Sequence, residues 1–248
     1  MEPLISIITV TYNSEESIMR TLDSINSQTF QDFEYIIIDG KSSDKTISII
    51  NNHEIIINKL VSEEDNGIYD ALNKGVKESN GKYIGFLHSD DEFYSKDSLK
   101  SIADSLVESD SDIIYGDLKY VSKGPNPKVI RDWVSGAFKK YKLHLGWMPP
   151  HPTLYMRKSL YKKNGFFNTN LKISADYDLM TRNFIKQNLK ITYLRKYIIL
   201  MTLGGESNKN LNNLYTALKE DISSMKANKI FWPLAIIFKK LSKMKQFI

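Results

Sequence analysis

The chain has 248 residues, 42% of them hydrophobic, which is enough to bury a sizeable core in one α/β domain with an appended tail. It contains no cysteine, so a disulfide framework, a thiolate metal site and a cysteine nucleophile are excluded. The net charge of +5 comes from the tail, because residues 226–248 hold six lysines and no acid and the rest of the chain sums to −1. This distribution predicts a local anionic surface as the tail's partner and argues against nucleic acid.

The amino-terminal stretch MEPLISIITV carries an acid at Glu2 and no basic segment before its apolar run, so it does not resemble a signal peptide. No apolar run reaches the roughly 20 residues that a membrane-spanning helix needs. We therefore expect a cytoplasmic protein, peripheral on the inner face of the cytoplasmic membrane if the tail binds lipid.

Short apolar runs alternate with helical stretches through the first half of the chain. Strands are predicted at 4–12, 33–40, 55–63, 82–89 and 112–121, and helices at 15–28, 43–52, 67–78 and 96–108. Nearly continuous apolar runs are typical of parallel strands that helices cover on both faces. The pattern predicts an α/β fold with a doubly wound, mostly parallel sheet, in which ligands bind beyond the carboxyl ends of the strands.

The second half is richer in glycine, proline and aromatic residues, and we predict a helix near 176–188, strands near 190–203 and a long helix after residue 208. We expect this smaller region to lie over the mouth of the sheet.

Polar residues follow four of the predicted strands, namely Thr11–Asn13, Asp39–Gly40, Glu64–Asp65 and Ser89–Asp91. Each group alone is an ordinary turn or helix cap, but four groups around one crevice indicate a ligand site. Asp90 and Asp91 suit a hard divalent cation, which shares its coordination positions with water and phosphate oxygens. The predicted ligand is therefore a diphosphate. The glycine-rich loops of ordinary ATPases and dinucleotide-binding enzymes are absent from the sequence.

Six segments carry a family resemblance: SIITVTYN, IIIDGKSSDKT, DNGIYDALNKG, FLHSDD, SADYDL and LGGES. In this order and spacing they resemble the inverting glycosyltransferases of family two, which have the GT-A fold. The resemblance covers roughly residues 4–207. It implies a domain at 1–207, with a nucleotide-sugar half at 1–120 and an acceptor half at 121–207, and a helical basic extension at 208–248.

The resemblance also implies roles for residues of the first half. The nucleoside would be bound by Thr9, Thr11, Tyr12 and Asp39, with Asp39 facing the base and Asp65 near the nucleotide. The family's Asp-x-Asp element corresponds to Ser89, Asp90 and Asp91. Asp90 would then lie near the ribose, and Asp91 would hold the Mn²⁺ or Mg²⁺ that bridges the diphosphate.

Asp176 matches the acid that serves as general base in the family, but Ala175 replaces its usual Glu partner, so Asp178 stays a rival. Lys74 is a candidate for the phosphate contact that an arginine usually makes in the family. His151, in PPHPTLY, is a candidate contact for acceptor or phosphate, although a lone histidine among prolines is more often a packing residue.

The implied activity is the transfer of one sugar, with inversion, from a nucleoside-diphosphate sugar, with uridine favoured on family grounds, to a hydroxyl of a saccharide acceptor. The acceptor hydroxyl needs a base to take its proton, and the departing diphosphate needs a cation. Two alternatives stay open. One is a non-catalytic sugar-nucleotide or glycan-binding module; the other is a nucleotidyltransferase, although TYNSEES lacks the glycine-rich basic loop usual after the first strand of such enzymes.

The tail after Pro233 places its apolar residues on one helical face, with the lysines away from it. The apolar face comprises Leu234, Ile237, Leu241, Met244 and Ile248, and the lysines are Lys239, Lys240 and Lys243. This predicts a basic amphipathic helix that either packs on the body or lies on an anionic membrane through residues 230–248. On the second alternative, the acceptor is lipid-linked, as is common in bacterial surface-polysaccharide assembly in this family.

Overall fold

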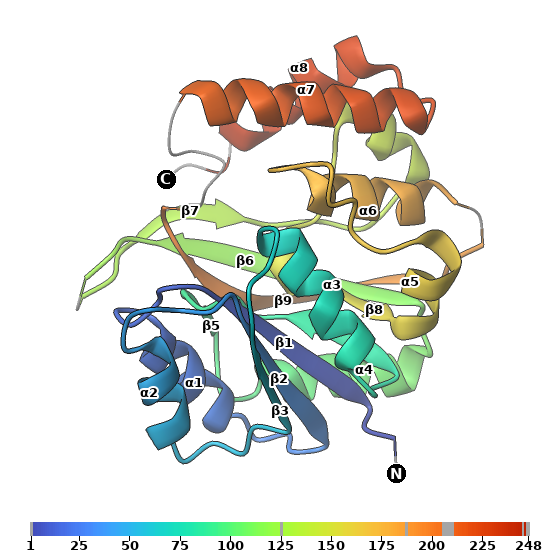
Figure 1. Cartoon of the computed structure of the whole chain (residues 1–248). Coiled ribbons are helices and arrows are strands. Elements are labelled where there is room, and N and C mark those ends of the chain that lie inside the picture. The colour runs from blue at the N-terminus through green and yellow to red at the C-terminus, as the bar shows by residue number, and fades with distance from the viewer. Residues whose placement is uncertain (1, 125, 187, 205–210, 245, 247–248) are drawn as a thin grey trace.

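The computed structural model describes residues 2–124, 126–186, 188–204, 211–244 and 246. One sheet of nine strands runs through this part of the chain in the order β3-β2-β1-β4-β8-β6-β9-β5, with β7 beside β6 (Figure 1). The strands are β1 (Ile5–Thr11), β2 (Phe33–Asp39), β3 (Lys59–Ser62), β4 (Tyr83–Phe86), β5 (Asp91–Phe93), β6 (Ile113–Val121), β7 (Val129–Trp133), β8 (Tyr155–Arg157) and β9 (Ile191–Thr202).

The sheet is mostly parallel, as predicted. Strands β3, β2, β1 and β4 pair in parallel, and so do β6 and β9. Strand β8 lies antiparallel between β4 and β6, so both parallel groups point the same way. Their carboxyl ends therefore lie at one edge of the sheet, where the sequence places its polar groups.

Helices cover both faces of the sheet because its central strands are apolar on both sides. On β1, Ile5 and Ile7 face one core, and Ile8 and Val10 face the other, as the two-residue period of a strand requires. The first core is closed by α1 (Ile18–Asn26), α2 (Thr46–Asn52) and α4 (Ser98–Ser109). The second is closed by α3 (Ile68–Glu78), α5 (Lys158–Asn164) and α6 (Ala175–Ile185).

The strands differ from the prediction in several places, since β4 is shorter than expected, β7 and β8 were not predicted, and β3 and β5 differ as follows. Strand β3 covers only Lys59–Ser62 of the predicted 55–63 and lies at the sheet edge. Just before it the Asn58 side chain accepts the Tyr35 N–H at 2.7 Å, and regular pairing with β2 begins at Lys59. The acids after β4 were expected in a loop, but Asp91 begins the short strand β5, which pairs antiparallel with β9 at Met201. The backbone of Asp91 is thus held inside the sheet.

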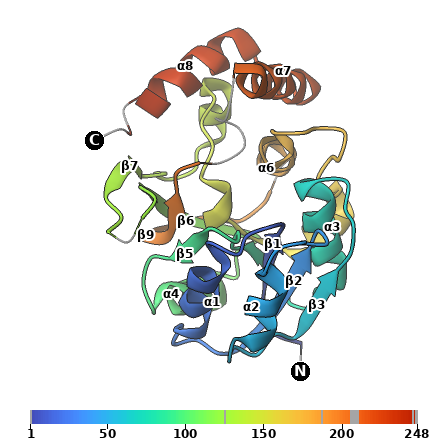
Figure 2. The same cartoon turned by 60° about the vertical axis from the view of Figure 1, so that its left-hand side comes forward.

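The last helices, α7 (Leu211–Ala227) and α8 (Trp232–Met244), lie together above the sheet, beyond α6 (Figure 2). Helix α8 packs on the 3₁₀ turn η1 (Lys140–Leu145) through the fully buried Ala235. A side chain at Gly146, the residue after η1, would clash, because its Cβ would lie 2.2 Å from the Ala235 carbonyl oxygen. Among the described residues, no helix is long and apolar enough to cross a membrane.

Of the two predicted domain limits, one lies within a strand and the other lies outside the described residues. The limit at residue 120 lies inside β6, so the sheet continues from the nucleotide-sugar half into the acceptor half. The limit at 207 lies outside the described residues, as do Gly205, Glu206 and Ser207 of the LGGES segment.

Candidate active site

The ends of β1 and β2 hold a buried carboxylate that is already hydrogen-bonded. Asp39 lies beside Thr11 across the two strands and is fully buried. Its oxygens accept bonds from the Ser42 amide at 2.9 Å, the Ser42 hydroxyl at 2.5 Å and the Ser62 hydroxyl at 2.7 Å. The Thr11 hydroxyl is buried without a partner among the described residues. At this point Thr11 offers a free polar group, whereas Asp39 has little unused accepting capacity.

Tyr12 and Asp65 flank a narrow gap at Gly40. The Tyr12 side chain is 65% exposed, so its ring is available for stacking. A Cβ on Gly40 would lie 2.6 Å from Asp65 Oδ2 and 3.4 Å from the Tyr12 ring. Asp65 is itself fixed, because its Oδ1 accepts the Gly67 N–H at 2.8 Å. The missing side chain of Gly40 thus keeps open the space between an aromatic ring and a carboxylate.

Thr9 and Lys74, both predicted to contact the nucleotide sugar, are bonded to the protein. The Thr9 hydroxyl is fully buried, donates to the Leu87 carbonyl at 2.7 Å and accepts from the Tyr35 hydroxyl at 3.0 Å. The Lys74 ammonium donates to the Glu64 carbonyl at 2.8 Å and pairs with Glu63 at 2.8 Å. In this conformation both side chains support the strand ends rather than line an open site.

Asp91 is a buried carboxylate without a partner. It is fully buried, and within the described part of the chain neither oxygen accepts a hydrogen bond of ordinary geometry. Burial, then the charge of Asp90, raises the pKa of Asp91 well above its usual value, although an interaction with the Thr202 backbone N–H opposes this rise. An unpaired buried carboxylate is unfavourable unless it is protonated or binds a cation. Its neighbours Ser89 and Asp90 are half-buried, and the Ser89 hydroxyl contacts the Ser14 hydroxyl at 2.9 Å.

The donor set at Asp91 fits Mg²⁺ or Mn²⁺, which prefer carboxylate oxygens. Among the described residues, no three His, Cys, Asp or Glu side chains gather into a complete metal site. A cation on Asp91 would therefore take most of its ligands from water and phosphate oxygens, which is usual for Mg²⁺.

Two histidines, His88 and His151, lie near Asp90 and Asp91, and only His151 was predicted from the sequence. His151 packs against Phe86 and Phe167, with ring centroids 5.3 and 5.6 Å apart, and lies 6.3 Å from the ring of His88. Burial, helped by His88, lowers the pKa of His151 to about 3, so the ring is neutral at pH 7. His88 Nδ1 and His151 Nε2 have no partner among the described residues. The position of His88, directly before the acids, was the available signal for it.

A cleft of about 390 Å³ opens between the sheet and the last two helices. It is lined by residues from β6, β9, α6, α7, α8 and the 3₁₀ turn η2 (His151–Thr153). Of the predicted site residues, His151 and Asp176 line this cleft, and His88 joins them. The nucleotide set at the ends of β1 and β2 lies outside its lining. Met201 lines the cleft and is the strand partner of Asp91, so Asp91 lies next to the cleft wall.

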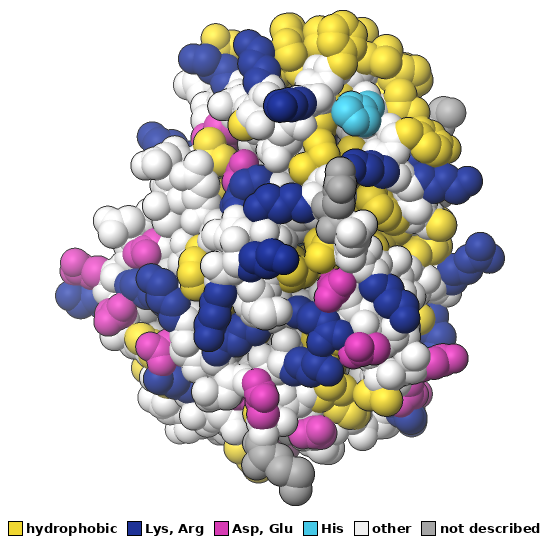
Figure 3. Space-filling view, turned by 90° about the vertical axis from the view of Figure 1, so that its right-hand side faces the viewer, with side chains coloured by type: hydrophobic (Ala, Val, Ile, Leu, Met, Phe, Trp, Pro, Cys, Tyr) yellow, Lys and Arg dark blue, Asp and Glu magenta, His cyan; other side chains and the backbone are white. Residues whose placement is uncertain are grey.

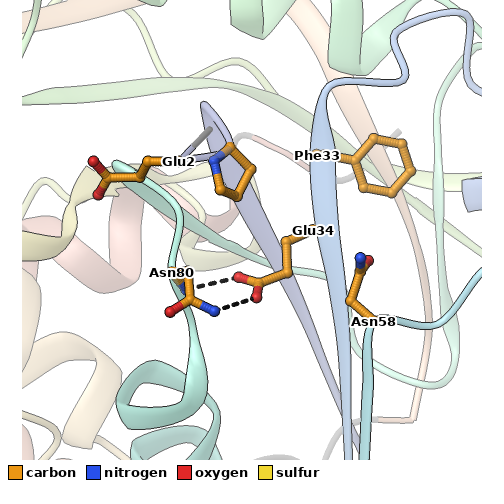
Figure 4. A pocket seen from close by; sticks show the side chains of 6 residues that line it. Glu2, Phe33, Glu34, Asn58 and Asn80 are labelled. Atoms are coloured by element: carbon orange, nitrogen blue, oxygen red, sulfur yellow. Dashed lines mark hydrogen bonds between the residues drawn. The ribbon is translucent and has the colours of Figure 1, made fainter.

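A second hollow of about 540 Å³ lies at the opposite end of the strands (Figure 4). Its one buried carboxylate, Glu34, accepts bonds from Ser6 at 2.6 Å and from the Asn80 amide and side chain at 2.7 and 2.8 Å. Glu34 therefore ties strand starts together. Ligand sites of parallel sheets lie at the carboxyl ends, which favours the cleft near Asp176.

The two candidate bases on α6 have different surroundings. Asp176 is half-buried in the cleft, and burial raises its pKa to about 6, opposed by the Tyr177 amide and the Lys239 ammonium. Asp178 is buried, pairs with Arg182 at 2.7 Å and accepts from the Ser224 hydroxyl at 3.3 Å. Asp178 thus joins α6 to α7. Asp176 accepts a long bond of 3.5 Å from the Tyr69 hydroxyl and lines the cleft with a pKa suited to a base at neutral pH.

Helix α8 is amphipathic as predicted, but its apolar face points to solvent. Five apolar side chains on it, at 234, 237, 238, 241 and 244, are 40% to 71% exposed. Lys239, Lys240 and Lys243 line the cleft, and Lys240 and Lys243 are also exposed to solvent. Lys239 pairs with Asp221 of α7 at 2.6 Å and lies 3.8 Å from the centre of the Tyr177 ring. The helix therefore packs on the body, as one alternative held, yet it leaves its apolar face uncovered.

Comparisons with known proteins agree with this architecture. The sequence model of the family described as Glycosyl transferase family 2 matches residues 6–172. The PGL/p-HBAD biosynthesis glycosyltransferase of Mycobacterium bovis is 32% identical over 214 residues, which cover 83% of this chain and 80% of that protein. The poly(ribitol-phosphate) beta-glucosyltransferase of Bacillus spizizenii is 29% identical over 90% of this chain, although the match spans only 37% of that protein.

A solved structure has the same fold. The crystal structure of S. aureus TarS 1-349 in complex with UDP-GlcNAc superposes with a TM-score of 0.71 and 23% identity, over 95% of this chain and 70% of that one. The curled, mostly parallel sheet with helices on both faces is thus the GT-A fold that the sequence predicted.

Proposed function

The chain belongs to glycosyl transferase family 2, and on that premise we propose that it transfers one sugar, with inversion, from a UDP-sugar to a hydroxyl of a saccharide acceptor in polysaccharide assembly. One observation carries the proposal. Asp91 pairs with Met201 across β5 and β9, and Met201 lines the cleft in which Asp176 stands. The proposed cation ligand is thus the strand neighbour of a residue that lines the cleft of the candidate base.

The donor side of the proposal uses the ends of β1 and β2. The exposed Tyr12 ring would stack on the base, with Asp65 across the Gly40 gap. The unpartnered Thr11 hydroxyl and the buried Asp39 would contact the nucleoside from the strand ends. Uridine is proposed because the related TarS structure contains UDP-GlcNAc.

Asp91 is the proposed ligand of Mn²⁺ or Mg²⁺, a group that, when bound, stabilises the negative charge of the departing diphosphate. Its two unpartnered oxygens are free to hold a cation, and the neighbouring Asp90 keeps the local charge negative. His88 and His151 are neutral, so they would donate or accept hydrogen bonds without adding charge.

Asp176 is the proposed general base. An acceptor hydroxyl has a pKa far above 7 and must lose its proton as the new bond forms. With a pKa of about 6, Asp176 is mostly ionised at pH 7 and is still basic enough to take that proton. Attack from the cleft side on the anomeric carbon, opposite the departing diphosphate, inverts the configuration in one displacement.

The test is release of UDP from UDP-sugars by the purified chain with Mn²⁺, with and without a chelator. We expect turnover that chelation removes, and Asp91→Asn should lower it at least about 100-fold, since the charge opposite the diphosphate is lost. A non-catalytic binding module would instead bind UDP, and neither wild type nor Asp91→Asn would release UDP from a UDP-sugar. Formation of a sugar nucleotide from a nucleoside triphosphate and a sugar phosphate would support the nucleotidyltransferase alternative.

We propose further that α8 rests on an anionic membrane surface. Its outward face exposes Ile237, Leu241 and Met244 to solvent, and Phe231 and Trp232 lie at the helix start. Hydrophobic side chains also gather at the end of the molecule that carries α7 and α8 (Figure 3). Such an apolar band is unfavourable in water, and the exposed Lys226 and Lys229 just before α8, outside the cleft lining, favour an anionic covering. The acceptor would then be lipid-linked.

Vesicle flotation tests this surface. Wild type should float with vesicles of phosphatidylglycerol and phosphatidylcholine and much less with phosphatidylcholine alone. Ile237→Gln/Leu241→Gln should stay in solution with an unchanged melting temperature, because both side chains are exposed. Ile56→Gln/Val107→Gln, which removes two exposed apolar residues elsewhere, is the matched control and should float like wild type. Equal flotation of both double variants would contradict the proposal.

A further inference from the structure

The lysines of α8 line the cleft, Lys239 half-buried and Lys240 and Lys243 exposed to solvent at its rim. Lys239, Lys240 and Lys243 all line the cleft, while the apolar face of the same helix is exposed. Lysines on a terminal helix ordinarily extend into solvent, where their ammonium groups are best hydrated. Lys240 and Lys243 keep this exposure, and together with the half-buried Lys239 they place three cations around one hollow.

The negative charge in the cleft does not balance these lysines. Among the described lining residues, the acids are Asp176 and Asp221, and Asp221 is already paired with Lys239 at 2.6 Å. Partial burial at the cleft rim, then the neighbouring Arg131 and Lys239, lowers the pKa of Lys243. Like charges held together in a half-closed space favour an anion as their counterpart.

The position of the lysines indicates the acceptor side. The cleft that they line contains Asp176, where the acceptor hydroxyl is proposed to lose its proton, and contains none of the residues proposed to hold the nucleoside. Tyr120 and Trp133 line the same cleft, and the Arg131 guanidinium lies over both rings, 4.6 and 4.7 Å from their centres, which adds a further cation on this side.

We propose that Lys240 and Lys243, with Lys239 behind them, form a subsite for a phosphate group carried by the acceptor, which positions the acceptor hydroxyl at Asp176. This inference rests on the proposed function of the cleft and names the chemical class of its acceptor, a phosphate ester or diphosphate ester of a sugar or polyol. Lys239 stays paired with Asp221 and fixes α8 against α7.

The experiment is a ligand-observed NMR titration with glycerol 3-phosphate, with glycerol as the uncharged counterpart, in the presence of Mg²⁺ and saturating UDP. UDP occupies the donor's diphosphate positions, so binding that persists belongs to a second site. The test variant is Lys240→Gln/Lys243→Gln, which leaves the Lys239–Asp221 pair intact. The control is Lys162→Gln/Lys163→Gln, which removes the same charge from two exposed lysines of α5.

We expect wild type and the α5 control to bind glycerol 3-phosphate with UDP present and to ignore glycerol. The α8 variant should bind it roughly tenfold more weakly, because two charge-assisted contacts are lost, and should bind UDP normally. Loss of binding when UDP is added would assign the lysines to the donor diphosphate and overturn the proposal. Equal weakening in both double variants would also overturn it, as an effect of net charge alone. A wild type that binds no UDP would instead contradict the proposed function.

Discussion

The donor and acceptor sides of the site are built in different ways. On the donor side, the polar groups follow adjacent strands, so Thr11 and Asp39 are neighbours by strand register. On the acceptor side, Asp176, Asp221 and Lys239 come from three helices separated along the chain. The donor side is thus fixed by the sheet itself, whereas the acceptor side depends on how α7 and α8 pack. We therefore expect substitutions on the donor side and on the acceptor side to have different effects.

The largest effect is expected for Asp176→Asn. Loss of the base should lower kcat by roughly 10²- to 10⁴-fold, since no positioned base then takes the proton of the acceptor's hydroxyl. Binding of UDP should be unchanged, because Asp176 lies outside the donor side. Steady-state kinetics together with calorimetric titration of UDP measure both quantities.

Asp178→Asn is the matched control for that substitution. It weakens the pair with Arg182, whose charge stays partly buried, so stability should fall by about 1–3 kcal/mol and the melting temperature by several degrees. Activity per folded molecule should persist. Should Asp178→Asn lose turnover and Asp176→Asn retain it, the assignment of the base would be reversed.

The difference between the two sides also explains what could be predicted from sequence. Strand periodicity predicts that Asp39, at the end of β2, lies where the carboxyl ends of the parallel strands meet. It does not predict that Asp91 begins the antiparallel strand β5. It cannot tell that Thr9 is buried under Tyr35, since that depends on packing across strands. The helical pattern of α8 predicted its two faces but not their direction, which is set by Ala235 against Gly146.

The pH dependence of the acceptor side should give an effect of intermediate size. Asp176 acts when ionised, so kcat/KM should rise with pH, level off above about 7, and be about tenfold lower at pH 5, one unit below the pKa of about 6. Stability should respond in the opposite direction. The folded pKa lies above the usual 3.8, so the ionised carboxylate destabilises the fold as pH rises from about 4 to 6.

Rate profiles and melting curves of wild type and Asp176→Asn between pH 4.5 and 8 measure both effects. The Asn variant lacks the ionisation, so its melting temperature relative to wild type should improve as pH rises through 6. A rate profile that is flat down to pH 5 would show that no group of this pKa takes the proton.

The smallest effect is expected on the donor side, from Tyr12→Ala. The ring is 65% exposed, so its removal should leave stability unchanged and weaken donor binding roughly fivefold, the low end of the contribution of one aromatic ring stacked on a base. Tyr12→Phe keeps the ring and should bind like wild type. The measurement is KM for the donor at saturating acceptor, with kcat unchanged because stacking is equal in ground and transition states. A rise in KM for the acceptor instead would mean that Tyr12 contacts the acceptor, which would contradict the division of the site into a donor side and an acceptor side.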